Sequence, residues 1–143
     1  MSLDQGHGPP FAGDWQIHRN GQSGNWTIGE FWVDMSTLRY CIEIADRHCN
    51  AFGVMHGGAM MTFMDSQVLL FQATECRGLH TPTISMNVDF LAPPGSGDWL
   101  VAAVDHVKTT RTMIVTRALV RVGDRVVAQS TAIYSNTFGK DAQ

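Results

Sequence analysis

The sequence predicts an α+β fold in which an antiparallel β-sheet is wrapped around one long central helix. The stretch 57–73, GGAMMTFMDSQVLLFQA, begins with glycines, contains no proline and is apolar on nearly every side, and a helix of that kind is normally enclosed by other structure. The stretch 83–90, TISMNVDF, alternates as a half-buried antiparallel strand does, with Ile84 on the apolar face and Thr83 on the polar face. Short segments rich in β-branched and aromatic residues lie on both sides of the helix.

The sequence before the helix predicts a lead-in and two strands. Residues 1–25 hold many of the glycines and two adjacent prolines, so a loosely ordered lead-in or one short helix is expected there. The segments 25–33 (NWTIGEFWV) and 38–45 (LRYCIEIA) are rich in aromatic and β-branched residues, which favours strands. The stretch 57–73 is too long for a typical strand and is therefore the expected helix.

Four more strands are expected after the helix. Proline and glycine residues end the first of them, and the last two are joined by Gly123-Asp124, a dipeptide suited to a tight hairpin. These four strands span residues 83–90, 99–107, 112–122 and 125–135. No internal repeat or second domain is evident, so the sequence predicts one domain over 26–138 and a tail over 139–143.

The composition is that of a globular protein with its own core. A chain of 143 residues buries roughly two thirds of the surface that its unfolded form exposes. The three cysteines are an odd number without CxxC spacing, which is typical of buried thiols in a reducing compartment. Although Cys41, His48, Cys49 and His56 are near one another in sequence, they lack paired ligand spacing, so no metal site is expected.

The charge pattern argues against two classes of partner. The formal net charge is -3 and the ten basic residues form no dense run, so neither nucleic acid nor an anionic membrane is an expected partner. The N-terminus lacks the basic and apolar regions of a signal peptide, and no run of about eighteen apolar residues occurs. A cytoplasmic protein is expected.

Asp65 is the only acidic residue in the stretch 57–73. A buried carboxylate is costly unless it is paired or hydrogen-bonded. On a helix, the face of Asp65 is shared by Gly58, Thr62, Leu69 and Gln72. A thin polar stripe that is suited to lining a cleft would therefore run along the helix. A carboxylate that caps a local loop or faces solvent fits the same pattern, and a buried carboxylate is only a probabilistic marker of a site.

The start of the same helix is a second candidate site. The N–H groups of Gly57 and Gly58 have no partner within a helix, and glycine leaves the approach to them free of a side chain. The helix dipole makes this end attractive to negative oxygen. Both glycines are therefore candidates to polarise a substrate carbonyl and to hold an oxyanion.

The two candidate sites are too far apart to share one reaction within a single chain. Gly57 and Asp65 are eight residues apart, which is about 12 Å along a helix, whereas a shared reacting group needs contacts of roughly 3 Å. If two helices pack antiparallel about a twofold axis, the helix start of one subunit lies near Asp65 of the other. The sequence thus predicts a dimer with composite sites, provided that both features serve one reaction.

The motif and its surroundings resemble a known family. The segment 50–58, NAFGVMHGG, is followed seven residues later by Asp65 and then by four predicted strands. This order resembles the hotdog-fold acyl-CoA thioesterases of the phenylacetate-degradation (PaaI) type over about residues 26–138. The resemblance implies a hotdog fold and hydrolysis of aryl- or fatty-acyl-CoA to free acid and coenzyme A. It also implies a homodimer at least, with dimers of dimers common in the family, and no cofactor, because coenzyme A is part of the substrate.

The resemblance carries roles over to five positions. Gly57 would supply the N–H that polarises the thioester carbonyl, and His56 would orient that turn. Asn50 would position the attacking water or the thioester. Asp65 of the partner subunit would be the general base or the nucleophile. Thr83 stands where relatives often carry a small hydroxyl residue that helps to hold the water.

Three of these residues have ordinary structural interpretations as well. Asn50 is a common turn residue, and His56 is equally suited to capping the helix or to packing in the core. Thr83 belongs to a residue type that favours strands. Only Asp65 and Gly57 are indicated by chemistry and spacing together.

Two basic residues are candidates for binding coenzyme A. Lys108 and Arg111 lie between two predicted strands, where relatives contact the nucleotide of the substrate. Charged residues of a solvated loop would look the same.

Three functions remain open from the sequence. The first is hydrolysis of an acyl-CoA thioester. The second is a hotdog enoyl-CoA hydratase or dehydratase, for which no matching motif is found. The third is a non-catalytic acyl-CoA binding protein, against which the retained Asn50, His56, Gly57 and Asp65 argue.

Overall fold

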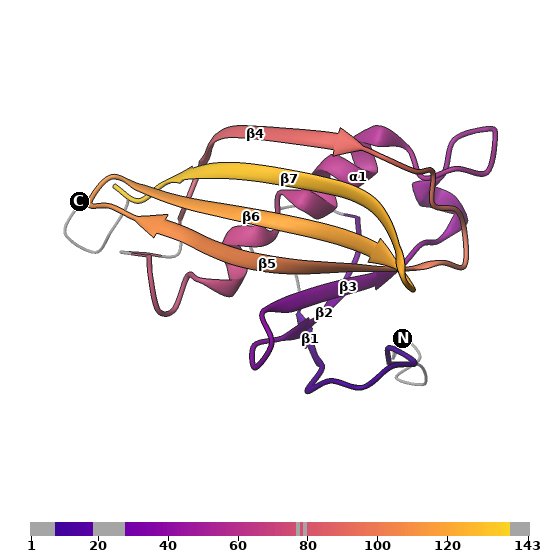
Figure 1. The fold of residues 1–143 in the computed structure, drawn as a ribbon, viewed down its shortest axis with the longest axis horizontal. Coiled ribbons are helices and arrows are strands. Elements are labelled where there is room, and N and C mark those ends of the chain that lie inside the picture. Colours follow the sequence, from indigo (N-terminus) through magenta and orange to yellow (C-terminus); the bar gives the residue numbers. More distant parts are fainter. Residues whose placement is uncertain (1–7, 19–27, 77, 79, 138–143) are drawn as a thin grey trace.

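The protein forms one antiparallel sheet and one α-helix (Figure 1). The computed structural model describes residues 8–18, 28–76, 78 and 80–137. The strands are β1 Gln16–His18, β2 Phe31–Asp34, β3 Arg39–Glu43, β4 Thr83–Phe90, β5 Trp99–Thr109, β6 Met113–Val122 and β7 Arg125–Ser135. The helix α1 spans Gly57–Met64, and 3-10 turns span Asp46–His48 and Gln67–Leu70.

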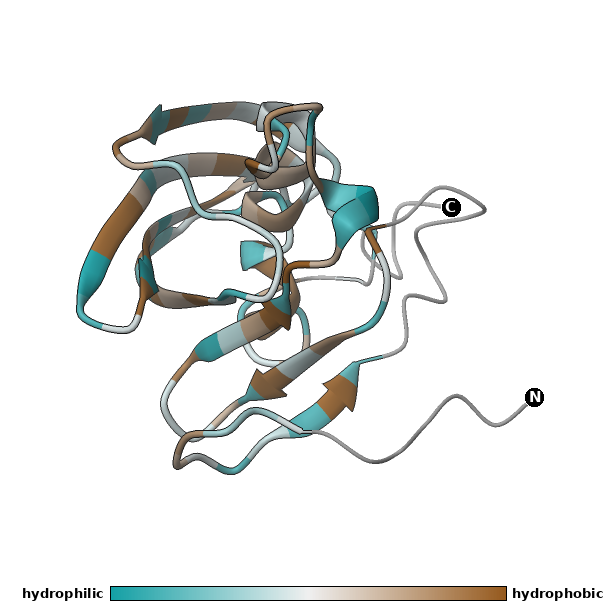
Figure 2. Ribbon diagram, turned by 90° about the vertical axis from the view of Figure 1, so that its right-hand side faces the viewer, coloured by the Kyte–Doolittle hydropathy of each residue, from teal (hydrophilic) through white to brown (hydrophobic). Residues whose placement is uncertain are grey.

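The sheet has the order β1-β2-β3-β5-β6-β7-β4, and all neighbouring strands are antiparallel. Seen from the side, the strands curve around α1 (Figure 2). Met60, Phe63 and Met64 of α1 are buried in the same apolar cluster as Tyr40 of β3 and Leu100 of β5. The predicted α+β fold, with an antiparallel sheet around a central helix, is confirmed.

The central helix is shorter than the predicted 57–73. It ends at Met64, Asp65 is its C-cap, and a 3-10 turn follows. Tertiary hydrogen bonds explain the early end, because two strand tyrosines donate to its last carbonyl groups. The Tyr40 hydroxyl donates to Phe63 O at 2.6 Å, and the Tyr134 hydroxyl donates to Asp65 O at 3.1 Å. These carbonyls therefore do not need the N–H groups of a continuing helix.

The N-terminal lead-in contributes a strand, where the sequence predicted loose order or a short helix. β1 pairs with β2, with Ile17 opposite Trp32. Asp34 is fully buried and accepts a hydrogen bond from the N–H of Asp14, while Arg39 forms an ion pair with Asp34 at 3.2 Å. These contacts hold the segment before β1 against the sheet. The rest of the lead-in, 1–7 and 19–25, and the tail 139–143 lie outside the described residues, so the predicted domain boundaries stay predictions.

The strands agree with the predicted positions, with differences at their ends. β2 begins at Phe31 and not at residue 25, and residues 25–27 lie outside the described part of the chain. β5 continues two residues past the predicted end, to Thr109. β6 and β7 agree with the predicted 112–122 and 125–135 to within one residue.

A β-bulge interrupts the alternation at the start of β4. The pairing with β7 shifts between Thr83 and Ser85, so that Thr83 stands opposite Tyr134 while Ser85 stands opposite Ile133. Directly opposite residues of an antiparallel pair point to the same face, and Tyr134 points into the core. The bulge therefore turns Thr83 toward the helix, against the predicted alternation, in the way that bulges re-aim side chains near functional sites.

No helix among the described residues is long and apolar enough to cross a membrane.

Candidate active site

Asn50 holds the turn that leads to the helix. Its side-chain oxygen accepts hydrogen bonds from the N–H groups of Phe52 at 2.9 Å and Val54 at 3.3 Å. In the structure, Asn50 thus acts as a turn residue. Because Oδ1 is occupied, the part of this side chain that remains for a ligand is the Nδ2 amide, a hydrogen-bond donor.

His56 is the N-cap of α1. Its Nδ1 accepts a 2.9 Å hydrogen bond from the N–H of Gly58, and its own N–H donates to His48 O at 2.7 Å. An unprotonated Nδ1 leaves the ring proton on Nε2. The capping bond also occupies the Gly58 N–H, so of the two glycines it is Gly57 whose N–H is left without a partner among the described residues.

Gly57 is one of the residues that line an apolar pocket. The cavity measures about 310 Å³ and is lined by Val54, Met55, Gly57, Met60 and the segment from Phe90 to Pro94. A β-carbon added to Gly57 would lie 3.8 Å from the ring of Phe90, which is ordinary contact. The protein's own packing therefore does not require glycine here, and the absent side chain keeps the donor open to a ligand.

Asp65 lies at the opposite end of α1 and is held at both its side chain and its main chain. Oδ1 accepts a 2.7 Å hydrogen bond from the Thr83 hydroxyl, and the main-chain carbonyl accepts from the Tyr134 hydroxyl. The three residues come from the end of α1, the start of β4 and the end of β7. The carboxylate is thus fixed by contacts between parts of the chain that are far apart in sequence.

Burial raises the pKa of Asp65 above its ordinary value of 3.8, while the hydroxyl of Thr83, which donates to the carboxylate, acts in the opposite direction. Desolvation disfavours the charged form, and hydrogen bonds to the carboxylate favour it. A carboxylate with a raised pKa is a better proton acceptor than an ordinary one, which suits a general base.

Lys108 and Arg111 lie at the Asp65 end of the sheet. Lys108 lies near the C-terminal end of β5, and Arg111 lies in the loop between β5 and β6. Both side chains are exposed. One row of paired residues crosses four strands at this end: Thr83, Tyr134, Ile114 and Thr109. The two cations are therefore near the Asp65 end of their own chain, and Phe90, which lines the same pocket as Gly57, is at the other end of β4.

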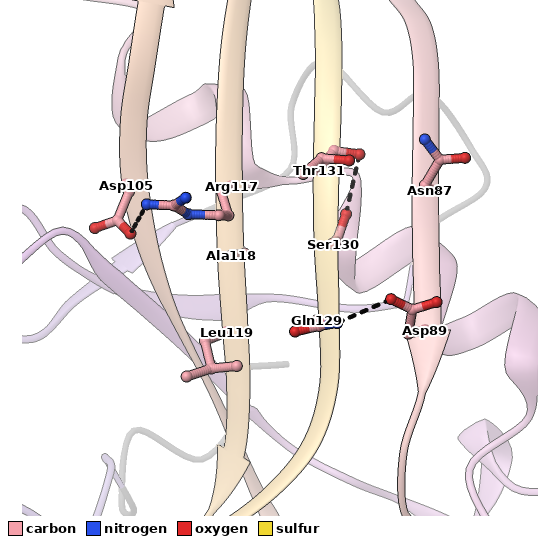
Figure 3. A pocket seen from close by; sticks show the side chains of 9 residues that line it. All are labelled: Asn87, Asp89, Asp105, Arg117, Ala118, Leu119, Gln129, Ser130 and Thr131. Carbon is pink, nitrogen blue, oxygen red and sulfur yellow. Dashed lines mark hydrogen bonds and ion pairs between the residues drawn. The ribbon is translucent and has the colours of Figure 1, made fainter.

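A second depression, of about 420 Å³, lies on the face of the sheet opposite α1 (Figure 3). Its charged side chains are paired with their neighbours: Arg117 with Asp105 at 3.3 Å, and Asp89 with Gln129 at 3.0 Å. None of the predicted site residues lines it. Among the residues described, no group of three histidine, cysteine, aspartate or glutamate side chains could hold a metal ion.

Sequence reasoning missed Tyr134, Tyr40 and Phe90. The chain has only two tyrosines, and both hydroxyls bind the end of α1. A buried tyrosine hydroxyl usually finds a hydrogen-bond partner, so the two tyrosines in predicted strands were a signal. The identity of the partner depends on strand pairing, which the sequence does not display.

Comparison with known proteins finds similar chains among esterases and thioesterases. A Pseudomonas aeruginosa protein that is provisionally named an esterase is 28% identical over 112 residues, covering 75% of this chain and 83% of that protein. Mouse acyl-coenzyme A thioesterase 13 is 27% identical over 73 residues, covering 50% of this chain and 51% of that enzyme. A Streptococcus mutans protein bound to acetyl CoA has the same fold, with a TM-score of 0.63 and 24% identity over 69% of this chain and 79% of that one.

A match to a family model shows which family this chain belongs to. The thioesterase superfamily matches residues 52–132, a range that contains His56, Gly57, Asp65 and Thr83 as well as the sheet from β4 into β7. The match confirms the resemblance, the hotdog fold and the class of enzyme that the sequence predicted. This chain belongs to the thioesterase superfamily of thioester hydrolases.

Proposed function

We propose that this chain hydrolyses acyl-CoA thioesters, with a fatty-acyl or aryl group, to the free acid and coenzyme A. The observation that carries the proposal is the N–H of Gly57, which has no partner among the described residues and belongs to a residue that lines an apolar pocket at the start of α1. A carbonyl oxygen that gains negative charge is stabilised by such a donor and by the helix dipole. The apolar walls suit the uncharged part of a substrate next to the reacting carbonyl.

The reacting groups come from two subunits in this proposal. Gly57 and Asp65 stand at opposite ends of α1, about 12 Å apart along its axis. β4 is the last strand of the sheet among the described residues, so one of its edges has main-chain groups without a strand partner in this part of the chain. Ile84 and Phe90 on this strand are each 55% exposed. A second copy that pairs along β4 would cover these side chains and bring its own Asp65 toward Gly57 of the first. A homodimer is the minimum, and dimers of dimers are compatible with it.

Asp65 acts on the carbonyl carbon by one of two routes. As a general base it accepts a proton from water while the water oxygen bonds to the carbon, and the resulting oxyanion is held by the Gly57 N–H. The carbon–sulfur bond then breaks, and the thiolate of coenzyme A takes up a proton from Asp65. As a nucleophile, Asp65 instead bonds to the carbon and expels the thiolate, and water cleaves the anhydride. Asn50 contributes its Nδ2 donor near the carbonyl, and Thr83 holds Oδ1 of Asp65.

Lys108 and Arg111 of the Asp65-bearing subunit are proposed to bind the phosphates of coenzyme A. Both are exposed at the Asp65 end of the sheet, which in the proposed dimer is the end that approaches the Gly57 pocket of the other subunit. Lysine and arginine bind phosphate through charge-assisted hydrogen bonds. The reaction needs no further cofactor, because coenzyme A enters as part of the substrate. The Streptococcus mutans protein of the same fold is bound to acetyl CoA.

Thiol release from acetyl-, hexanoyl-, palmitoyl-, phenylacetyl- and hydroxybenzoyl-CoA tests the proposal, with the native protein beside Asp65→Asn. Release that collapses in a folded Asp65→Asn variant supports hydrolysis, and the best ester defines the substrate class. Equal rates would remove Asp65 from the chemistry. Tight binding of the esters without release would support a binding protein, and hydration of crotonyl-CoA without thiol release would support a hydratase.

The route is tested by a single turnover in water labelled with oxygen-18. Label in the Asp65 carboxylate, read by mass spectrometry of the peptide, is expected only if Asp65 is the nucleophile. Label confined to the released acid is expected for a general base.

A further inference from the structure

We propose that Tyr134 is a positioning residue for Asp65: its hydroxyl fixes the main chain at Asp65 while the opposite residue, Thr83, fixes the carboxylate. The inference rests on the proposed function, because it concerns the group that activates water or attacks the thioester. Tyr134 does not itself touch the reacting atoms in this scheme. It acts through Asp65.

Tyr134 reaches the end of α1 from the far end of β7. Its side chain is 1% exposed, and its hydroxyl donates to the Asp65 carbonyl oxygen at 3.1 Å. Thr83 stands opposite Tyr134 in the pairing of β4 with β7 and donates to Asp65 Oδ1 at 2.7 Å. Two directly paired strand residues therefore hold the two polar ends of the same aspartate.

Within the described part of the chain, the Tyr134 hydroxyl is the hydrogen-bond donor to the Asp65 carbonyl. In a continuing helix it would accept from the N–H of Leu69, but that N–H donates to Ser66 O at 3.1 Å. A carbonyl shielded from water and left without a partner is destabilising, so loss of the hydroxyl favours rotation of the Asp65 peptide. Such a rotation changes the direction of the Cα–Cβ bond and moves the carboxylate.

Three hydroxyl-bearing side chains pack around this aspartate from three strands: Tyr40 from β3, Thr83 from β4 and Tyr134 from β7. Tyr40 binds the carbonyl groups of Phe63 and Met64, and not that of Asp65. Burial raises the pKa of Asp65, and the Thr83 hydroxyl opposes that effect by donating to Oδ1. Because Tyr134 holds the main chain that directs this carboxylate toward Thr83, loss of the Tyr134 hydroxyl is expected to weaken the Thr83 bond and to raise the pKa of Asp65 further. Loss of the Tyr40 hydroxyl is not expected to do so, because Tyr40 binds other carbonyl groups.

Tyr134→Phe beside Tyr40→Phe is the matched test, since each variant loses one buried hydroxyl that binds the end of α1. The measurements are the pH profile of kcat/KM with the best ester and the titration of the Asp65 carboxyl carbon by ¹³C NMR, assigned by its absence in Asp65→Asn. For Tyr134→Phe we expect an acid limb and an NMR midpoint at higher pH, and a kcat about tenfold lower with little change in KM. For Tyr40→Phe we expect a similar loss of thermal stability and an unchanged acid limb.

Equal pH profiles for native protein and Tyr134→Phe, or equal shifts in both tyrosine variants, would overturn the inference and leave the proposed function intact. A native protein that releases no thiol from any ester would overturn the proposed function. The NMR titration then still decides on Tyr134, because an Asp65 midpoint that is the same in native protein and Tyr134→Phe contradicts positioning through this hydroxyl.

Discussion

The Thr83 hydroxyl donates to Oδ1 of Asp65 at 2.7 Å, and this bond joins the first residue of β4 to the C-cap residue of α1. The bulge at the start of β4 makes the bond available by turning Thr83 toward the helix. Since burial raises the pKa of Asp65 and the Thr83 hydroxyl lowers it, the bond sets both the direction of the carboxylate and its proton affinity.

Thr83→Val keeps the shape of the side chain and removes the hydroxyl. The variant is expected to lose about tenfold in kcat/KM near the acid limb, because a hydrogen bond to a charged group contributes about 1.5–3 kcal/mol. The acid limb is expected at higher pH. Thr83→Ser keeps the hydroxyl and serves as the control, so a serine variant as impaired as the valine variant would show that the methyl group and not the hydroxyl matters.

Gly57→Pro removes the proposed oxyanion donor with little change to the fold. Proline is well tolerated at the first position of a helix, and the preceding His56, with φ -61° and ψ 136°, already has the conformation that proline requires of its neighbour. The variant is expected to fold and to lose about 10²–10³ in kcat, as other enzymes do without an oxyanion donor.

Gly57→Ala separates bulk from the N–H, because it adds a β-carbon in ordinary contact with Phe90 and keeps the donor. It is expected to be more active than Gly57→Pro. Equal activity of the proline variant and the native protein, measured by thiol release, would exclude the Gly57 N–H from the reaction.

Asp65→Asn is expected to be more stable than the native protein at neutral pH. The carboxyl pKa is raised by burial, so the contribution of Asp65 to stability is fully present below its unfolded pKa and is lost as the pH rises through the folded pKa. Asparagine retains an oxygen that accepts from Thr83 and carries no charge. Thermal unfolding should therefore give a higher Tm for the variant at pH 7 and a difference that shrinks toward acid pH; a lower Tm at pH 7 would contradict this.

Gln67 stabilises the turn that follows Asp65. Its side chain is fully buried, accepts from Thr116 at 2.8 Å and donates to Ser130 at 3.0 Å. Gln67→Leu leaves both hydroxyls without this partner and is expected to cost about 2–4 kcal/mol in urea unfolding at fixed protein concentration.

The triple variant Gln67→Leu, Thr116→Val, Ser130→Ala removes the whole buried network. It is expected to regain much of the lost stability, because replacing all partners by apolar groups leaves nothing unsatisfied. A triple variant less stable than the native protein by the sum of the three single losses would show that the network does not act as a unit.

The fold class and part of the site could be predicted because their signals are local. Alternation identified β4, all-round apolarity identified α1, and Asn50, His56, Gly57 and Asp65 lie in one continuous segment. The end of α1 could not be predicted, because it depends on hydroxyls that Tyr40 and Tyr134 bring from distant strands.

The orientation of Thr83 was predicted wrongly for a related reason. Alternation assigns Thr83 to the outer face, and a single extra residue in the pairing with β7 reverses that assignment. The strand β1 was missed because Gln16–His18 is short and becomes a strand by pairing with β2. Contacts between distant segments are the information that residue patterns lack.

The central claim, a site shared by two subunits, is tested most directly by mixing two inactive chains. Gly57→Pro and Asp65→Asn carry different affinity tags, are co-expressed, and the heterodimer is purified through both tags. One of its two composite sites then has a native Gly57 and a native Asp65, so thiol release at about half the native rate per dimer is predicted. A heterodimer as inactive as either variant alone would contradict a composite site, because a site within one chain is damaged in every subunit.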